Sequence, residues 1–311
     1  MTKVAFIFPG QGSQSPGMGR ELAEAFPAAR RVFDEADAAL GFPISKLCFE
    51  GPAEDLQLTA NTQPAILAVS AAAAAVLSEK GIKPDFVAGH SLGEYSAYVA
   101  AGALDLADAV QLVRKRGTYM QEAVPVGQGA MAALIGVGLD VAVKLAAAAA
   151  EGDVCQAAND NEPGQVVISG SKAAIDRAIA LSKDYGVRRA LPLKVSAPFH
   201  CALMQPAAVA MQKALADIQA SAPCVPVVAN VLASAISEPG EIKARLVEQV
   251  AGTVRWRESV DYMAKAGVRT FVEAGAGKVL SGMARRIVAD AETVTLGTPQ
   301  EIEDFAKKIS G

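Results

Sequence analysis

The chain has only two histidines in 311 residues, His90 and His200, and this scarcity limits the chemistry that it can carry. A metal site built on imidazole ligands has almost nothing to draw on. The four cysteines show no CxxC spacing, which disfavours both a zinc cluster and a disulfide framework. We therefore expect no bound metal and no disulfides, and free thiols of this kind are typical of a reducing cytoplasm.

An excess of positive charge, a long apolar run and a secretory leader are also missing. Lys and Arg total 29 against 33 Asp and Glu, and the net charge of −4 makes nucleic acid an unexpected partner. The most membrane-like run, residues 65–77, is mostly alanine and shorter than the roughly 20 residues that span a bilayer. Residues 1–4 show no sign of a secretory signal. We expect a cytoplasmic monomer that binds no membrane.

What the sequence does contain is a large apolar fraction in an alternating pattern. Hydrophobic residues make up 51% and charged residues 20%, which suits a chain with a sizeable buried core. Short apolar runs predict strands at residues 4–8 and 85–89. Helical periodicity predicts helices at residues 19–40, 62–80, 91–101 and 106–123. Strands that alternate with helices predict an α/β fold with a mainly parallel sheet.

The pattern changes after residue 125. Residues 127–196 show the order β-α-β-β-α-β, which is the ferredoxin-like arrangement. Its strands are expected at 130–137, 154–158, 165–169 and 188–195, its helices at 139–150 and 172–183, and a turn at 159–164. Apolar strands then return at 225–229 and 270–273. We expect a discontinuous large α/β domain, residues 1–126 and 197–311, interrupted by a small domain of residues 127–196.

The strongest chemical signal is the G-x-S-x-G sequence of residues 89–93, between a predicted strand and a predicted helix. In a nucleophile elbow the glycines allow a sharp turn that lifts the serine hydroxyl out at the carboxyl end of a strand. The helix N-terminus that follows favours negative charge on a reacting oxygen. Ser91 is therefore the candidate nucleophile, and the flanking elements disfavour an incidental serine.

A serine nucleophile needs a base, and histidine is the usual one. His90 adjoins Ser91, and neighbouring residues at a sharp turn generally point apart, so we expect His90 to be a packed or orienting residue. His200 is the remaining candidate, and the chain order Ser…His matches hydrolase-like α/β sheets. No acidic residue has an obvious claim to orient the imidazole. A neutral carbonyl would serve, because Nδ1–H needs an acceptor rather than a charge.

Two further segments bear on the site. The loop at residues 8–14 begins Gly10-x-Gly12 but has Ser15 where a dinucleotide fingerprint needs glycine. We expect it instead to supply a second oxyanion N–H donor. Arg116, in the basic triplet 114–116, could bind a substrate carboxylate bidentately if it faces the site, whereas such triplets usually form a solvated helix face.

Together these residues resemble the malonyl-CoA:acyl carrier protein transacylase family of bacterial fatty-acid biosynthesis. The resemblance covers essentially the whole chain, and its motifs stand in the same order. They are residues 10–14, 89–95, Arg116-Gly117, Asn161-x-Pro163-Gly164-Gln165, Phe199-His200, and Gln249 with a nearby tryptophan. The family implies a hydrolase-like α/β domain with an inserted ferredoxin-like subdomain, and an active site in the cleft between them.

The resemblance also implies roles for individual residues. Ser91 would be the nucleophile, His200 the base, and Gln249 the source of the carbonyl that orients His200. The backbone amides of Gln11 and Leu92 would form the oxyanion hole. The substrate would be bound by Arg116 at its free carboxylate and lined by Phe199, His90 and Asn161. Phe199 would form a pocket wall, although packing as plain core is the alternative.

The implied enzyme is an acyltransferase of lipid metabolism. It would take malonyl-CoA as substrate and holo acyl carrier protein as a transient, acidic partner, with phosphopantetheine carried by that partner and no cofactor of its own. Because the chain is itself acidic, docking needs a local basic patch, for which the candidates are Lys278, Arg285 and Arg286. The alternatives are an acyltransferase that loads a polyketide synthase or malonate decarboxylase carrier, a serine hydrolase, and a non-catalytic carrier-binding module.

Overall fold

β1 (Lys3–Phe8) lies inside the larger sheet because both of its faces are apolar. In this computed structural model, which describes residues 3–310, Phe6 and Phe8 enter one hydrophobic core and Ala5 and Ile7 enter another. A parallel strand buried on both faces has this near-continuous apolar sequence. The sheet order is β10-β9-β1-β2-β7-β8, and every pair is parallel except β7 with β8.

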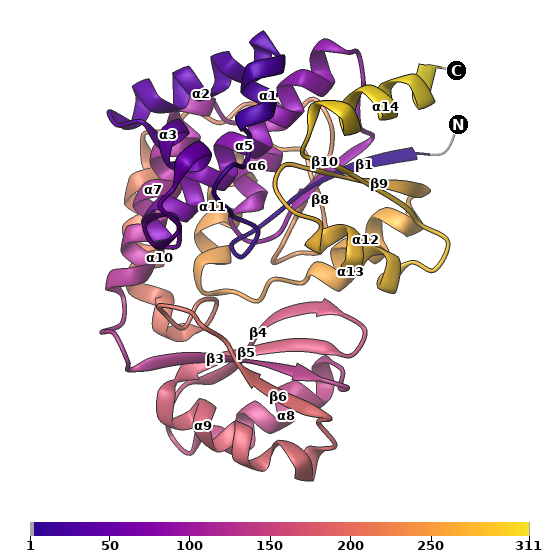
Figure 1. Cartoon of the computed structure of the whole chain (residues 1–311). Coiled ribbons are helices and arrows are strands. Elements are labelled where there is room, and N and C mark those ends of the chain that lie inside the picture. Colours follow the sequence, from indigo (N-terminus) through magenta and orange to yellow (C-terminus); the bar gives the residue numbers. More distant parts are fainter. Residues whose placement is uncertain (1–2, 311) are drawn as a thin grey trace.

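Helices cover both faces of this sheet (Figure 1). The other strands are β2 (Phe86–Gly89), β7 (Val227–Ala229), β8 (Ser234–Ile236), β9 (Val268–Ala274) and β10 (Glu292–Leu296). One core is covered mainly by α1 (Arg20–Ala25), α2 (Pro27–Leu40), α3 (Ile44–Glu50), α4 (Ala53–Leu56), α5 (Thr59–Glu79), α6 (Gly93–Ala100), α7 (Leu106–Glu122), η2 (Ala202–Met204), α10 (Gln205–Ala216), α11 (Pro239–Ala251) and α14 (Pro299–Ser310). The other core is covered by α12 (Trp256–Lys265) and α13 (Val279–Ile287).

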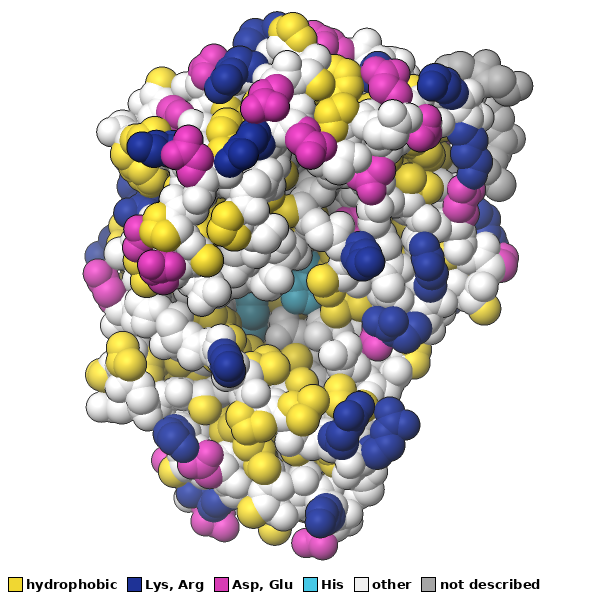
Figure 2. Space-filling model, in the orientation of Figure 1, with side chains coloured by type: hydrophobic (Ala, Val, Ile, Leu, Met, Phe, Trp, Pro, Cys, Tyr) yellow, Lys and Arg dark blue, Asp and Glu magenta, His cyan; other side chains and the backbone are white. Residues whose placement is uncertain are grey.

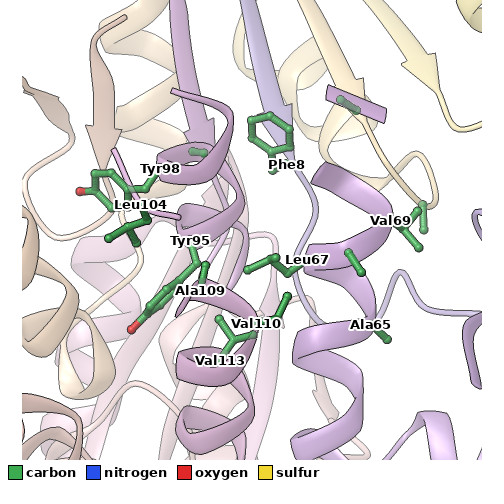
Figure 3. Close-up of a cluster of buried hydrophobic side chains, with 14 of the residues drawn as sticks. Phe8, Ala65, Leu67, Val69, Tyr95, Tyr98, Leu104, Ala109, Val110 and Val113 are labelled. Carbon is green, nitrogen blue, oxygen red and sulfur yellow. The ribbon is translucent and has the colours of Figure 1, made fainter. Parts of the chain in front are cut away.

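Of the described helices, α5 alone is long and apolar enough to cross a membrane, and 78% of that apolar window is buried inside the protein. It packs against α7, α2 and α6. Figure 3 shows Leu67 of α5 beside Val110 and Val113 of α7 in this core, with Ala65 and Val69 on the other side of α5. Its apolar character is therefore used for packing between helices.

The smaller sheet is antiparallel and has the strand order β4-β5-β3-β6. Its elements run β3 (Gly129–Ile135), α8 (Leu139–Ala150), β4 (Cys155–Glu162), β5 (Gln165–Ser171), α9 (Lys172–Leu181), η1 (Ser182–Tyr185) and β6 (Arg189–Pro192). The order β-α-β-β-α-β with the first strand between the third and fourth is ferredoxin-like. The predicted α/β fold with a second, ferredoxin-like sheet is confirmed.

Several local predictions are wrong, each for a physical reason. The helix expected at 19–40 is two helices, because Phe26 is extended and Pro27 starts the second one. The turn expected at 159–164 is short, because Asn159 and Asp160 pair with β5 and continue β4. The helix expected from residue 91 begins at Gly93, and the strand expected to reach 195 ends at Pro192. The strands β8 and β10 are absent from the sequence prediction: β8 is only three residues long and forms a hairpin with β7, and β10 depends on parallel pairing with β9.

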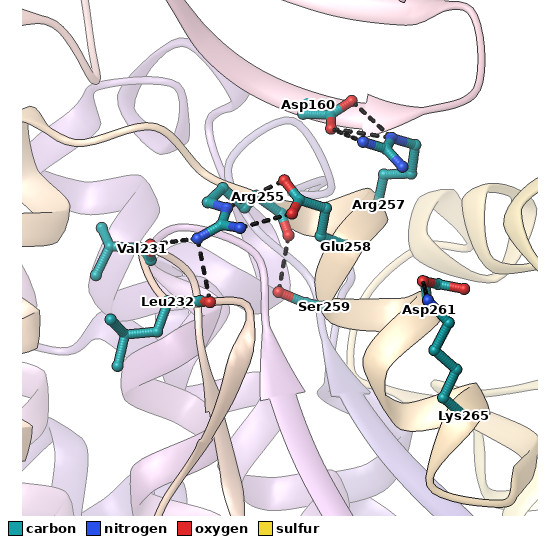
Figure 4. A network of polar contacts seen from close by, with 9 residues as sticks. All are labelled: Asp160, Val231, Leu232, Arg255, Arg257, Glu258, Ser259, Asp261 and Lys265. Atoms are coloured by element: carbon teal, nitrogen blue, oxygen red, sulfur yellow. Dashed lines mark hydrogen bonds and ion pairs between the residues drawn. The ribbon is translucent and has the colours of Figure 1, made fainter. Parts of the chain in front are cut away.

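We call the smaller sheet with its helices the small domain and the larger sheet with its helices the large domain. Polar contacts link β4 of the small domain to α12 of the large one (Figure 4). Arg257, on α12, forms a 2.8 Å ion pair with Asp160, whose side chain is buried. Arg255 holds the start of α12 by bonding the carbonyls of Val231 and Leu232. The charged pair between the domains fixes the position of β4, and β4 carries residues of the cavity described below.

The turn from β2 to α6 is built from backbone in very close contact. A Cβ on Gly89 would lie 1.9 Å from the Gly93 carbonyl, and one on Gly93 would lie 2.2 Å from the Phe8 oxygen. No side chain fits at either position without moving the backbone, so glycine is required at both ends of the turn.

We expect Gly89→Ala to destabilise the protein by more than about 2 kcal/mol, because overpacking here meets backbone that cannot rotate away. The measurement is the free energy of unfolding by urea. The control is Gly240→Ala in α11, where nothing lies within 4 Å of the added Cβ and alanine should be neutral or stabilising. Equal stabilities of the two variants would contradict this account of the turn.

Candidate active site

Ser91 stands at the tip of the β2–α6 turn in a left-handed backbone conformation, with φ of 53°. A non-glycine residue there is strained, and surrounding contacts must hold it. Asn230 does so: its Oδ1 accepts from the Ser91 N–H at 2.8 Å, and its Nδ2 donates to the Gly89 carbonyl at 2.7 Å. The turn thereby places Ser91 in the lining of the cavity described below.

His200 lies against this hydroxyl, with 2.7 Å between Ser91 Oγ and His200 Nε2. The other ring nitrogen, Nδ1, lies 3.0 Å from the Gln249 carbonyl and 3.2 Å from the Gly252 carbonyl. Carbonyls only accept hydrogen bonds, so Nδ1 carries the proton and Nε2 is free to accept from serine. The pair has the geometry of a nucleophile and its base, oriented by neutral carbonyls.

Burial and a neighbouring cation keep His200 neutral. Its side chain is buried, and desolvation together with the charge of Arg116 lowers the pKa of His200 to about 3, against its hydrogen bonds to the two carbonyls, which raise the pKa. The lowered pKa means that the neutral imidazole persists as the pH falls well below the usual 6.5. His200 is available as a base throughout the neutral range.

Arg116 is 1% exposed and reaches the same hydroxyl, with Nη2 3.1 Å from Ser91 Oγ. Its hydrogen-bond partners are side-chain amides: Gln63 Oε1 accepts from Nη1 at 2.9 Å and Gln249 Oε1 accepts from Nη2 at 2.8 Å. Its Nε has no partner among the described residues. Burial lowers the pKa of Arg116, and no described carboxylate forms an ion pair with it. A buried cation partnered by neutral groups is a strong site for an anion.

His90 points away from the base position. Its Nε2 lies 2.9 Å from Asn161 Oδ1, and its ring meets the edge of Trp256 with 5.7 Å between ring centroids. Gly10 lies close to it, since a Cβ there would be 2.6 Å from the His90 carbonyl. Desolvation lowers the pKa of His90. The structure thus gives His90 a packed, hydrogen-bonded position between the two domains.

A cavity of about 370 Å³ joins these groups. The large domain lines it with Gln11, Ser91, Leu92, Arg116, Phe199 and His200, and the small domain lines it with Met131, Asn159, Asn161, Val167, Leu193 and Val195, among other residues. In Figure 2 the two histidines lie at the bottom of a hollow between the upper and lower parts of the molecule. Every site residue expected from the sequence, apart from Gln249 and the proposed docking residues, therefore lines one space, and Gln249 lies directly behind Arg116 and His200.

The two oxyanion candidates, Gln11 and Leu92, both line the same cavity. The Ser91 N–H is occupied by Asn230, so the first amide after the nucleophile is that of Leu92, at the start of α6. Gln11 follows β1 and lines the cavity from the other side of the turn. The two amides come from different loops, as in hydrolase-like sites.

The basic residues considered for docking lie on or beside α13, which borders the cavity with Val279, Leu280 and Met283. Lys278 is exposed at its N-terminal end, and Arg285 is exposed and bonds Thr293. Arg286 forms a 2.6 Å ion pair with Glu162 of the small domain. Arg286 therefore also links the two domains, and this contact was not foreseen from the sequence.

Sequence reasoning missed Asn230, Gln63 and Gly252. Asn230 lies 139 residues from Ser91 in the sequence, and Gly252 lies 52 residues from His200. Gln63 lies 53 residues from Arg116. The only local signal was polarity in an apolar context: Gln63 precedes the alanine-rich part of α5, and its burial there requires a partner.

Comparisons with known proteins agree with this geometry. Residues 5–301 match the family described as acyl transferase domain. A curated relative from Bacillus subtilis (strain 168), malonyl CoA-acyl carrier protein transacylase, is 49% identical over 304 residues, covering 97% of this chain and 96% of the relative.

Solved structures are equally similar. The crystal structure of an acyl carrier protein S-malonyltransferase from Vibrio cholerae superposes with a TM-score of 0.96 at 46% identity, covering 98% of this chain and all of that one, 100%. A type II PKS acyl-carrier protein in complex with its malonyl-transacylase contains a chain that is 42% identical with a TM-score of 0.96, covering 99% of this chain and 100% of that one. The chain belongs to the malonyl-CoA:acyl carrier protein transacylase family of acyl transferases.

Proposed function

We propose that the protein transfers the malonyl group of malonyl-CoA to the phosphopantetheine thiol of a holo acyl carrier protein, through an ester on Ser91. The observation that carries this proposal is the placement of a buried, uncompensated cation beside a serine–histidine pair: Arg116 Nη2 is 3.1 Å from the hydroxyl that His200 contacts at 2.7 Å. A site of this kind suits an acyl group that carries its own carboxylate.

In the first half-reaction Ser91 Oγ attacks the thioester carbonyl carbon while its proton passes to His200 Nε2. The carbonyl π electrons move onto oxygen, and the N–H groups of Gln11 and Leu92 donate to that oxyanion. When the intermediate collapses, the C–S bond breaks and the imidazolium returns its proton to the departing CoA sulfur. The product is a malonyl ester of Ser91.

The second half-reaction reverses these steps. The carrier's thiol gives its proton to His200, its sulfur attacks the ester carbonyl, and Ser91 Oγ leaves and regains a proton. A neutral carbonyl stabilises the imidazolium less than a carboxylate would. A thioester is already an activated acyl donor, so the weaker pair suffices. The ester lies within the interdomain cavity, where limited access of water favours transfer over hydrolysis.

Arg116 would act on both binding and chemistry. Its charge lowers the pKa of His200 and so opposes the imidazolium that forms during acylation. A malonyl carboxylate bound to Arg116 would compensate that charge, whereas an acetyl group would not. The same contact therefore favours malonyl-CoA in the bound state and in the transition state. Phe199 and Asn161 would border the acyl group, and His90 would hold Asn161 in place.

The carrier would dock over α13. Lys278, Arg285 and Arg286 give this edge positive charge, and Val279 beside them is 47% exposed at the cavity. An acidic partner is steered by such a local patch although the whole chain has a net charge of −4. The long thiol arm would then enter past Val279 and Met283.

We further propose that the enzyme works as a cytoplasmic monomer, needs no cofactor and binds neither membrane nor nucleic acid. Three of its four cysteines, Cys48, Cys155 and Cys201, are buried and unpaired, which suits a reducing compartment. A polyketide carrier is the second candidate partner, because a relative with a TM-score of 0.96 has been solved with a type II PKS acyl-carrier protein.

We expect intact-mass analysis after mixing with malonyl-CoA to show a malonyl adduct that is absent in Ser91→Ala and strongly reduced in His200→Ala. The control is Ser96→Ala, which removes a buried hydroxyl of α6, the helix that follows Ser91, and should leave the adduct unchanged. The adduct should discharge onto holo carrier protein and only slowly to water, and fatty-acid and polyketide carriers are compared at this step. Rapid discharge to water without a carrier would identify a hydrolase, and absence of any adduct would indicate a binding module.

Arg116→Ala should lower kcat/KM for malonyl-CoA on the order of 100-fold, the scale of losing a buried charge pair, while acetyl-CoA is used relatively better. Initial rates with the two acyl donors measure this ratio. Arg114→Ala is the matched control, because Arg114 bonds the Ala60 carbonyl and packs on Phe42 outside the cavity. An unchanged malonyl-to-acetyl ratio in Arg116→Ala would rule out the carboxylate contact.

Reversing two exposed charges, Lys278→Glu with Arg285→Glu, should raise KM for the carrier protein roughly tenfold and leave KM for malonyl-CoA alone. Arg286 is spared because its reversal would also repel Glu162. The control reverses Arg30 on α2 and Lys46 on α3, two exposed residues that change the net charge equally but contribute nothing to the cavity lining. Equal effects of both double variants would place the carrier elsewhere.

A further inference from the structure

Glu94 is a buried acidic residue that the chemistry described above does not use. It lies in the first turn of α6, three residues after the nucleophile, and its side chain is 0% exposed. No described lysine or arginine forms an ion pair with it, and burial raises the pKa of Glu94 to about 7 against its hydrogen bonds and the charge of Arg116. A carboxyl group in this setting destabilises the fold relative to an apolar side chain.

What Glu94 provides there is hydrogen-bond acceptors. Its Oε2 accepts from the Asn230 backbone N–H and from Gln249 Nε2, both at 2.9 Å, and its Oε1 accepts from the Tyr98 hydroxyl at 3.2 Å. Asn230 is the residue that holds the Ser91 turn. Gln249 is the residue that contacts both Arg116 and His200.

The side-chain amide of Gln249 can satisfy its hydrogen-bond partners in only one orientation. Its Nε2 donates to Glu94 Oε2 and, at 2.8 Å, to the Ser91 carbonyl, while its Oε1 accepts from Arg116 Nη2 at 2.8 Å. A flipped amide would set its NH₂ against the guanidinium, donor against donor, and its oxygen against two acceptors. The acceptor at Glu94 therefore selects the orientation in which Gln249 holds Arg116.

We propose that Glu94 is a positioning residue for acyl-group selection: through the side-chain amide of Gln249 it holds Arg116 in the orientation that receives the malonyl carboxylate. This proposal rests on the proposed function, since it concerns how Arg116 is placed for that substrate. The chain of contacts runs from Glu94 to Gln249 to Arg116 and Ser91, and no substrate contact by Glu94 itself is required.

Three substitutions at Glu94 distinguish the effect of its hydrogen-bond acceptor from the effect of its negative charge. Glu94→Gln keeps an amide oxygen that can accept from Gln249 and Asn230, while its NH₂ can donate to Tyr98, so it should retain malonyl-CoA kcat/KM within about threefold. Glu94→Asp withdraws the carboxylate from Gln249 but keeps an acid there, and Glu94→Met removes the acceptor at similar size. Both should lower kcat/KM for malonyl-CoA at least about tenfold, the scale of one buried hydrogen bond, with a smaller loss for acetyl-CoA.

The readout is the malonyl-to-acetyl ratio of acylation rates on folded enzyme, with the unfolding midpoint measured in parallel. Tyr98→Phe is the matched control, because it removes the third hydrogen bond of Glu94 without touching Gln249. It should leave the ratio as in the wild type even if its midpoint falls. If Glu94→Met does not fold, Glu94→Asp and Glu94→Gln carry the comparison.

The proposal is overturned if Glu94→Asp and Glu94→Met keep the wild-type ratio and lose only stability, which would be a structural role. It is also overturned if Glu94→Gln loses as much selectivity as Glu94→Met, because charge and not orientation would then matter. Absence of a malonyl adduct on the wild-type protein would instead refute the proposed function. The Glu94 variants therefore test the positioning role, and the wild-type protein tests the proposed function.

Discussion

The close backbone contact at the β2–α6 turn is the constraint on which the rest of the site depends. Because the start of α6 is pressed against the end of β1, with no room for a side chain at Gly89 or Gly93, the loop after β1 and the helix N-terminus meet at one point. Ser91 is lifted there in a strained conformation, with φ of 53°. Asn230 and the packed strands hold the strain, and the loop after β1 and the start of α6 line the same cavity as Ser91.

A second feature of the site is that Arg116 and His200 both have neutral hydrogen-bond partners. Arg116 is held by amide oxygens and His200 by backbone carbonyls, so neither is matched by a fixed opposite charge. A carboxylate in place of Gln63 would bind Arg116 within the protein and compete with the substrate. Leaving the cation uncompensated costs folding free energy, and under the proposed function it reserves the attraction for an acyl group with its own negative charge.

The two domains contribute to one cavity, and ion pairs hold them in register. Asp160 and Glu162, both on β4, reach Arg257 on α12 and Arg286 on α13. Their neighbours Asn159 and Asn161 line the cavity, so the strand that bonds to the large domain also forms a wall of the site. The interface therefore sets the distance between Ser91 and the opposite wall, and α13, which borders the cavity, is tied to the same strand.

The sequence by itself determined what depends on backbone geometry over a few residues. Alternating strands and helices indicated the α/β fold, and the glycines around Ser91 indicated the turn. The scarcity of histidine left His200 as the candidate base, and its Nε2 lies 2.7 Å from Ser91 Oγ. The tertiary structure alone decided which distant groups complete the site. Asn230 meets Ser91 across 139 residues and Glu94 meets Gln249 across 155. Such contacts are set by how the sheet and helices pack, and a polar side chain shows in sequence only that it will need a partner, not which one.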